Sequence, residues 1–150
     1  MDSDRPLLIP LDAPGPLDEK IVGGKAAKLG RLAHAGFRVP KGFCLTIWAY
    51  EAFVEDSKIA AAIGMELGRK SMDDMRWEEI WDAALRIRAT FLAQPLSDLL
   101  RERITEASSG FGASTPLAVR SSAIGEDSAG CSFAGLHESI IGVRGKRALE

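Results

Sequence analysis

The sequence has few of the features that mark a secreted, membrane-bound or nucleic-acid-binding protein. It contains 2 cysteines in 150 residues, and Cys44 and Cys131 form no C-x-x-C pair, which is typical of free thiols in a reducing compartment, with a disulfide as the alternative. No apolar run approaches the roughly 18 residues that a membrane helix needs, and no leader with a charged and then an apolar segment opens the chain. The 19 basic and 21 acidic residues give a net charge of −2, so neither nucleic acid nor a membrane is expected as a partner. We therefore expect a cytoplasmic protein.

What is present is the composition of an ordinary globular domain, with 46% hydrophobic and 27% charged residues. Four prolines around the apolar run at residues 7–9 predict a short edge strand and an irregular connection over residues 1–20. Beyond them, apolar periodicity predicts helices and strands in one chain, and hence an α+β class. The expected helices span residues 24–35, 46–53, 59–67, 77–92 and 95–107, and the expected strands span residues 42–45, 117–119 and 139–143.

The clearest helical pattern lies between Trp77 and Leu92, where apolar side chains recur at intervals of three and four residues and Arg88 is the one polar member. So regular a stripe is typical of a face buried in the core. We therefore predict that its tryptophans are core residues rather than a stacking platform for a ligand. The run at residues 117–119, which follows Pro116, is likewise predicted to be a buried strand.

Gly23-Gly24-Lys25 is the first candidate binding site. Two glycines permit close approach of the backbone and positive φ angles. At the start of a helix, unpaired N–H groups and the helix dipole favour an anion, to which Lys25 adds a full charge. The alternative is an ordinary loop beside a solvated lysine. The six cations between residues 20 and 41, with no acid among them, leave the same two interpretations open: an anion-facing region or a solvated helix face.

Arg120 is the second candidate, because it ends an apolar strand and carries a fork of donors suited to phosphate oxygens. A salt bridge to Glu126 or Asp127 is the alternative, and a metal site at these two acids is not favoured because they lack the spacing of a cation loop. The segment from Ser132 to Ser139 offers glycine and hydroxyls to a polyphosphate, with a plain hairpin loop as the alternative. No catalytic triad or zinc motif is present in the sequence.

These segments together resemble the N-terminal nucleotide-binding domain of phosphoenolpyruvate synthase, pyruvate phosphate dikinase and the related rifampicin phosphotransferases. Several blocks follow one another in the order and spacing of that family, whereas each block alone would be a weak signal. The matching blocks are VGGKAAKLG at 22–30, AGFRVPKGF at 35–43, AVRSSA at 118–123, ED at 126–127 and SFAG at 132–135.

The resemblance implies an α+β (α/β) fold that forms the N-terminal part of an ATP-grasp-like nucleotide-binding domain, with several helices packed on a small mixed sheet. Residues 1–150 would then be the N-terminal subdomain of that unit, and the other domains of the family would be absent from this chain.

The resemblance also implies a binding role for particular residues. Lys25 and Arg120 match family residues that contact the phosphates of ATP. The segment from Gly135 to Ser139 and Ile140 matches a loop that closes over the triphosphate with backbone amides and a hydroxyl. Two departures are visible: the family usually has glutamine at the position of Leu136, which is therefore not carried over, and threonine at the position of Ser139, where serine keeps the hydroxyl.

Other parts of the family's machinery have no match in the sequence. Mg²⁺ is expected in the full-length family, but its acidic ligands and the adenine site would lie beyond Glu150. Neither His34 nor His137 has the context of the family's phosphohistidine. We therefore assign no catalytic residue and no metal ligand, and expect the chain alone to be inactive.

The expected function is that of the ATP-binding lobe of a phosphotransferase, or kinase, similar to phosphoenolpyruvate synthase. That enzyme converts ATP, pyruvate and water to phosphoenolpyruvate, AMP and phosphate through a phosphohistidine, here carried elsewhere. One alternative is the lobe of an enzyme similar to rifampicin phosphotransferase, with an antibiotic as the small-molecule acceptor in place of pyruvate. Another is a catalytically silent nucleotide-binding or regulatory module, and the plainest is a helical α/β domain with a solvated basic face.

Overall fold

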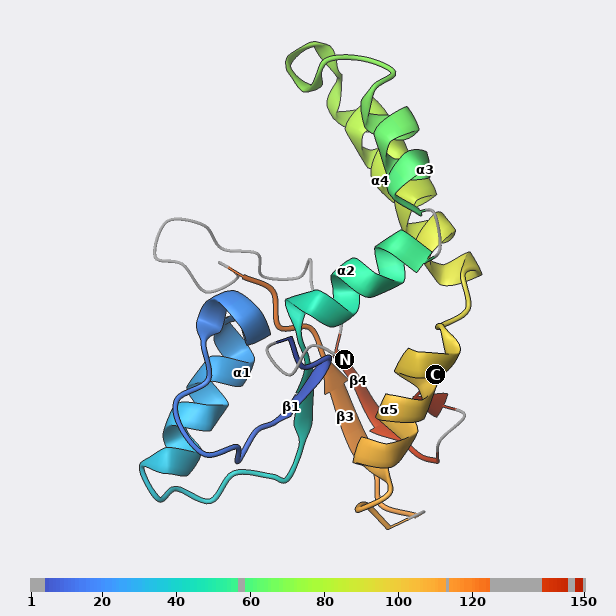
Figure 1. The fold of residues 1–150 in the computed structure, drawn as a ribbon. Coiled ribbons are helices and arrows are strands. Elements are labelled where there is room, and N and C mark those ends of the chain that lie inside the picture. Colours follow the sequence, from blue (N-terminus) through green and yellow to red (C-terminus); the bar gives the residue numbers. More distant parts are fainter. Residues whose placement is uncertain (1–4, 57–58, 113, 125–138, 146–147, 150) are drawn as a thin grey trace. The chain divides into compact units, whose positions relative to one another are not determined.

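The computed structural model describes residues 5–56, 59–112, 114–124, 139–145 and 148–149 (Figure 1). These residues form helices and short strands, which confirms the α+β class. The elements are β1 (Leu8–Pro10), α1 (Glu19–His34), β2 (Phe43–Leu45), α2 (Ile47–Asp56), α3 (Ile59–Leu67), a 3-10 turn (Met72–Asp74), α4 (Trp77–Ala93), α5 (Asp98–Ser108), β3 (Leu117–Arg120) and β4 (Ser139–Val143). The chain divides into two compact units, one made of residues 1–50 and 98–150 and the other of residues 51–97.

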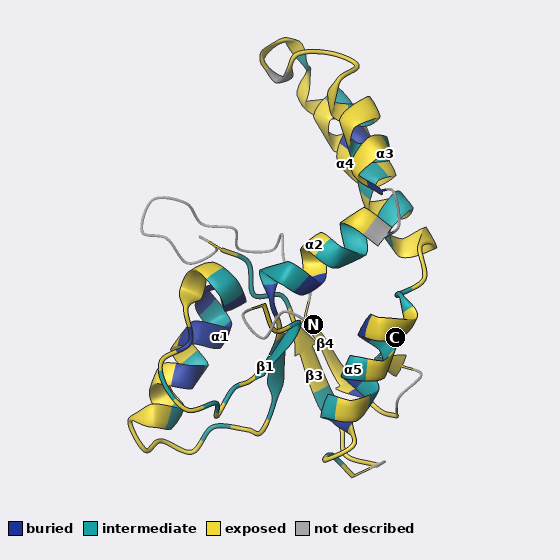
Figure 2. Cartoon of the chain, viewed as in Figure 1, coloured by how far each residue is buried: buried dark blue, intermediate teal, exposed yellow. Residues whose placement is uncertain are grey.

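In the first unit, β1 and β2 form an antiparallel pair in which Ile9 lies opposite Cys44. Their predicted positions were correct to within a residue or two. Helix α1 buries a side made of small and apolar residues (Figure 2), and its core cluster is surrounded by half-buried side chains that include those of Ile9 and Cys44. The members of this cluster are Leu17, Val22, Ala26 and Ala27. Because alanine is small, the helix backbone can lie close to its neighbours here.

Helix α1 begins earlier than predicted. The carboxylate of Asp18 accepts a hydrogen bond from the backbone N–H of Lys20 at 2.9 Å and caps the first turn. The helix then runs through a kink at Gly23 and ends, as predicted, just before Gly36, whose φ of +82° suits a helix-ending glycine. The predicted start at residue 24 was the position of the kink, not of the first turn.

Strands β3 and β4 form a second antiparallel pair, with Val119 opposite Ile140. One small mixed sheet was expected, whereas the described strands form two separate two-stranded antiparallel sheets. The prediction that residues 117–119 are buried was also wrong, because Leu117 is half-buried and Ala118 and Val119 are exposed. Among the described strands, β3 has one partner, and a single hairpin leaves much of its own surface in solvent.

The second unit contains the packed pair α3 and α4. Ile59 is almost fully buried, at 1% exposure, and the rings of Phe53 and Phe91 stack with their centroids 6.1 Å apart. At the start of α4, the carboxylate of Glu79 accepts the backbone N–H of Arg76 at 2.8 Å and pairs with the Lys70 ammonium at 3.0 Å. These two interactions lower the pKa of Glu79 to about 2.

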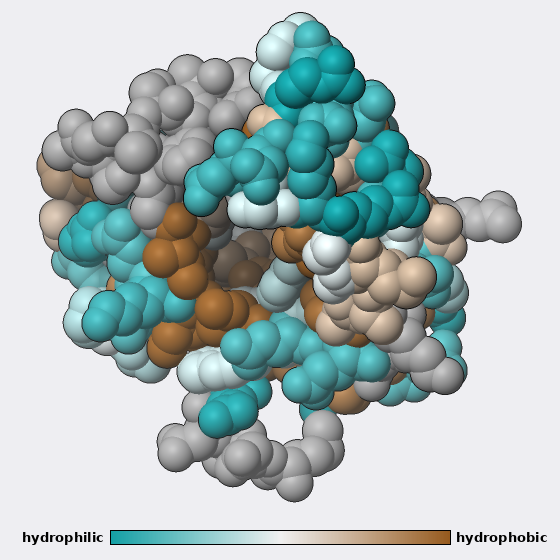
Figure 3. All heavy atoms as spheres, turned by 90° about the horizontal axis from the view of Figure 1, so that it is seen from above, coloured by the Kyte–Doolittle hydropathy of each residue, from teal (hydrophilic) through white to brown (hydrophobic). Residues whose placement is uncertain are grey.

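The prediction that the α4 stripe is core was wrong, because Phe91 is the one half-buried member of the predicted stripe and its other members are exposed. At 100° per residue, the apolar positions of α4 cover an arc of roughly 200°. One half of the arc contains buried Ala83 and half-buried Ile87, while Trp77 and Trp81 on the other half are 72% and 59% exposed. One neighbouring helix covers only part of so wide an arc. Apolar side chains also reach the surface in the view of Figure 3.

Within the described residues, none of the helices combines the length and the apolar character that crossing a bilayer requires.

Candidate functional site

The candidate site lies in the first unit, where the kink of α1 meets the segment that follows β3. Gly23 has φ 77° and ψ 167°, which is far from helical geometry. The next residue, Gly24, donates its backbone N–H to the carbonyl of Ala123 at 3.4 Å. A segment near the start of the chain is thereby joined to one about a hundred residues later, so the two predicted candidate regions are neighbours.

A second contact at this place passes through the hydroxyl of Ser122. Its Oγ accepts the backbone N–H of Ala26 at 3.0 Å and donates to the carbonyl of Val22 at 2.8 Å. In an uninterrupted helix that N–H and that carbonyl would bond to each other, because they are four residues apart. The hydroxyl is therefore inserted into the helical ladder, which is a recognised cause of a kink.

Both predicted cationic residues flank this junction. Lys25 lies between Gly24 and Ala26, whose N–H groups make the two contacts, and its side chain is half-buried. Arg120 is the last residue of β3, two positions before Ser122, and is exposed. The backbone positions of the two cations are thus linked by hydrogen bonds that involve their near neighbours.

The other predicted site residues lie on or beyond β4. Ser139 is the register partner of Arg120, and Ile140 is the partner of Val119. Residues opposite each other in an antiparallel pair place their side chains on the same face, so Ser139 shares a face with Arg120 and Ile140 does not. A contribution of Ile140 to the same ligand would therefore come from its backbone. Gly135, and the acids Glu126 and Asp127, lie outside the described residues.

One part of the sequence-based prediction needs correction. We expected the N–H groups after Gly23 to be unpaired and available to an anion. Two of them, those of Gly24 and Ala26, instead donate to Ala123 and Ser122. The glycine pair brings two backbones together, so these two N–H groups are not available to an anion.

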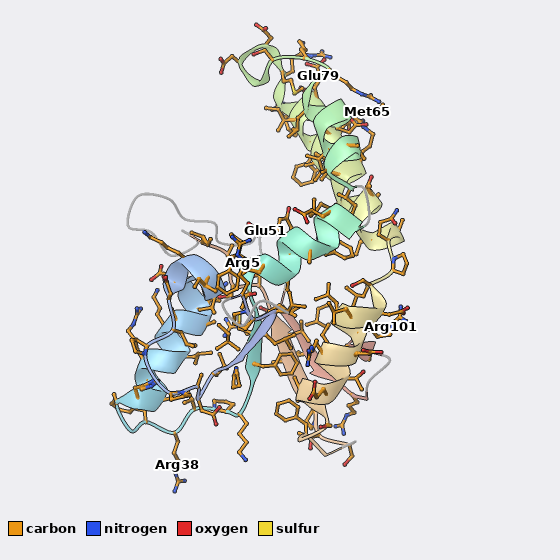
Figure 4. All side chains as sticks on the ribbon, viewed as in Figure 1. Arg5, Arg38, Glu51, Met65, Glu79 and Arg101 are labelled. Carbon is orange, nitrogen blue, oxygen red and sulfur yellow. The ribbon has the colours of Figure 1, made fainter. Side chains whose placement is uncertain are left out.

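The basic stretch between residues 20 and 41 does not behave as one surface. All six of its cations lie within the described residues, and Lys25 alone among them is half-buried. Arg31 lies 3.9 Å from the carboxylate of Glu19. Figure 4 shows Arg38 extending away from the loop that follows α1. The interpretation as a solvated face therefore fits most of the stretch, and Lys25 is the exception.

Two small polar side chains complete the surroundings of the junction. The thiol of Cys44 donates to the Val22 carbonyl at 3.4 Å and to that of Leu45 at 3.1 Å, and burial raises the pKa of Cys44 to about 11. The hydroxyl oxygen of Ser121 is buried without a hydrogen-bond partner among the residues that the structure describes. Neither hydroxyl of the pair Ser121 and Ser122 was among the predicted site residues. The sequence feature that could have indicated them is their position directly after an apolar strand.

The described residues do not provide an evident site for Mg²⁺. Nowhere in the described ranges do three or more carboxylate, imidazole or thiol side chains gather, and Mg²⁺ prefers carboxylate ligands. A cavity of about 500 Å³ in the first unit is lined by residues that include Phe111, Thr115 and Leu117, and none of its lining residues within the described ranges is ionisable. The charged candidate residues are thus found at the junction and not in this cavity.

Comparison with known proteins identifies the family. Residues 19–149 match the model of the pyruvate phosphate dikinase AMP/ATP-binding domain. Because this match spans most of the chain, the protein belongs to that family. The resemblance noted in the sequence is confirmed.

Curated relatives carry two different names. The chain is 42% identical over 130 residues to a rifampicin phosphotransferase of Streptomyces sviceus, which covers 86% of the chain and 15% of the relative. It is 39% identical to a phosphoenolpyruvate synthase of Aeropyrum pernix, with 84% and 16% covered. It is 33% identical to the phosphoenolpyruvate synthase of Escherichia coli, with 96% and 19% covered. The chain therefore spans less than a fifth of the length of each of these relatives.

Proposed function

We propose that this chain supplies the phosphate-binding part of an ATP site in a phosphotransferase. The observation that carries the proposal is the junction itself, where Gly24 and Ala26 of α1 bond to Ala123 and Ser122 after β3. This junction brings the segment of Lys25 to the segment of Arg120. The family to which the chain belongs is described as AMP/ATP-binding, and the phosphates of these nucleotides are ligands that two neighbouring cationic residues suit.

The chemistry of a triphosphate explains why these residue types are useful. Its oxygens carry several negative charges, and transfer of a phosphoryl group is favoured by positive groups that are fixed before the reaction begins. Arg120 offers a planar fork of donors, while Lys25 offers a compact charge. Ser139, opposite Arg120 in the β pair, adds a hydroxyl on the same face. In the proposed site, Ile140 and Gly135 contribute backbone N–H groups.

The complete reaction would need groups that the described residues do not offer. We propose an ATP-grasp-like arrangement in which Mg²⁺ ligands, the adenine site and the phosphoryl acceptor come from other parts of a longer protein. The proposed reaction is that of phosphoenolpyruvate synthase, with pyruvate as the small-molecule acceptor. A rifampicin phosphotransferase-like reaction is the second candidate, because relatives of both names match the chain at similar identity. The chain alone would bind nucleotide without transferring a phosphoryl group.

Calorimetric titration of the full chain with ATP tests the binding proposal. Lys25→Ala and Arg120→Ala should each weaken ATP binding by about tenfold, which is the order of one charge-assisted contact. Arg38→Ala and Lys41→Ala are the matched controls, because both residues are exposed and lie between α1 and β2 rather than on the kinked turn. These two variants should bind ATP as the unaltered chain does.

The outcomes separate the candidate functions. Equal binding by all four variants and the unaltered chain would contradict the proposed site and favour the silent module, or a domain without nucleotide. ATP hydrolysis by the purified chain that is lost in Lys25→Ala would contradict the claim that the chain alone is inactive. We expect substitutions at Lys25 and Arg120 to weaken ATP binding, and we expect the purified chain not to hydrolyse ATP.

A further inference from the structure

The hydroxyl of Ser122, a residue that follows β3, takes the place of a backbone hydrogen bond within helix α1. The Ala26 N–H and the Val22 carbonyl would pair directly in a regular turn of α1, but each instead bonds to the Ser122 Oγ, at 3.0 Å and 2.8 Å. The hydroxyl satisfies both backbone groups and holds the turn open. Lys25 lies within this opened turn.

The kink has an alternative that the sequence permits. Gly23 adopts φ 77° here, but glycine adopts helical angles as well. If the Ser122 hydroxyl were absent, the Val22 carbonyl and the Ala26 N–H would each lose a partner, which is costly for buried backbone groups. Closing the turn would restore their direct bond, and this would change the direction in which Lys25 leaves the helix.

Ser122 also ties this turn to the strand that carries Arg120. The two bonds of its hydroxyl reach 96 and 100 residues along the chain, and Ser122 follows Arg120 by two positions. A third hydrogen bond of the same junction, from the Gly24 N–H to the Ala123 carbonyl, is longer at 3.4 Å. The hydroxyl is therefore the shorter of the two connections between the cationic segments.

We infer that Ser122 is a positioning residue for nucleotide binding: its hydroxyl holds the α1 turn open and so directs Lys25 at the polyphosphate that Arg120 also contacts. This inference rests on the proposed function. It concerns a residue that acts through Lys25 and need not touch the nucleotide.

The test compares ATP binding by the full chain in Ser122→Ala, Ser122→Thr and Ser121→Ala, measured by calorimetry. Ser122→Ala should weaken ATP binding by about tenfold, because Lys25 is no longer directed at the phosphates. Ser122→Thr keeps the hydroxyl and should restore binding to within about threefold. Ser121→Ala removes the neighbouring hydroxyl, which has no partner among the described residues, and should bind as the unaltered chain does.

A double-substitution cycle shows whether Ser122 acts through Lys25. In the Lys25→Ala background, Ser122→Ala should cause no further loss, because the side chain that it positions is already gone. Losses that add in full would overturn the inference and indicate a merely structural role. If Ser122→Ala does not fold, Ser122→Cys takes its place in the cycle under the same criterion, because a thiol is a weaker partner for the Ala26 N–H.

Failure of the inference is distinguishable from failure of the proposed function. If Lys25→Ala and Arg120→Ala weaken ATP binding while Ser122→Ala does not, the nucleotide site stands and the role of Ser122 is wrong. If none of these variants changes ATP binding, the proposed function fails and this inference fails with it.

Discussion

The backbone of Ser122 fills the space in which a side chain at Gly23 would lie. A Cβ atom placed on Gly23 would overlap the carbonyl carbon and oxygen of Ser122 and would come within 2.7 Å of its hydroxyl oxygen. The φ of 77° at Gly23 is also a conformation that residues with a side chain rarely adopt. Two independent constraints therefore require glycine at this position, and both belong to the kink that joins α1 to the segment after β3.

Replacing Gly23 should accordingly lower the free energy of unfolding. Gly23→Ala imposes both backbone strain and overlap with Ser122, for an expected loss of about 2–4 kcal/mol in the free energy of unfolding. Gly36→Ala is the matched control, because Gly36 has a similar φ of 82° and no atom within 4 Å of its hypothetical Cβ. It should lose only about 1–2 kcal/mol. Urea denaturation followed by circular dichroism measures both.

The difference between the two losses in the free energy of unfolding measures the cost of the overlap between a side chain at residue 23 and Ser122. Equal losses in Gly23→Ala and Gly36→Ala would mean that the overlap is relieved without cost, and that the junction is looser than the structure indicates. A larger loss in Gly23→Ala than in Gly36→Ala would support the tight junction on which the proposed site depends.

The packing of α3 and α4 leads to a second prediction. Ile59, at 1% exposure, fills the interior of this unit, whereas Trp77 is 72% exposed. Ile59→Ala should cost about 2–5 kcal/mol through lost burial and a residual cavity, while Trp77→Ala should change stability by less than about 1 kcal/mol. Thermal denaturation of the chain checks both. A large loss in Trp77→Ala would show that the outward half of the α4 stripe is covered.

The local patterns of the sequence were sufficient to predict most of the elements. Apolar spacing predicted α4 and β4 almost to the residue, and Gly36 correctly predicted the end of α1. These features depend on interactions between residues close together in the chain, which periodicity and capping rules describe. The α+β class was predictable for the same reason.

The features that were missed depend on distant parts of the chain. The kink at Gly23 is stabilised by Ser122, about a hundred positions later, and no local pattern specifies such a contact. The exposure of Trp77 was missed because a regular apolar stripe shows which side of a helix is apolar but not how much of it a neighbour covers. The separation of the described strands into two antiparallel pairs is likewise a property of long-range pairing.

The thiol of Cys44 allows a prediction about pH. Burial raises its pKa from 9.0 to about 11, whereas in the unfolded chain the thiol ionises near its ordinary value. The stabilisation associated with the neutral thiol is thus complete below pH 9 and is lost as the pH rises toward 11, because the unfolded state releases its proton first. Cys44→Ala should remove this component of the pH dependence of the free energy of unfolding.

Alkylation of the thiol by iodoacetamide measures the same shift directly, since the thiolate is the reactive form. In a Cys131→Ser background, which leaves one thiol, the folded chain below pH 9 should react about a hundredfold more slowly than the same chain unfolded in concentrated urea. The folded rate should keep rising with pH beyond the point where the unfolded rate levels off. If both rates level off near pH 9, the thiol is not buried against the Val22 carbonyl, and the packing of β2 on the kinked turn of α1 must differ from that described.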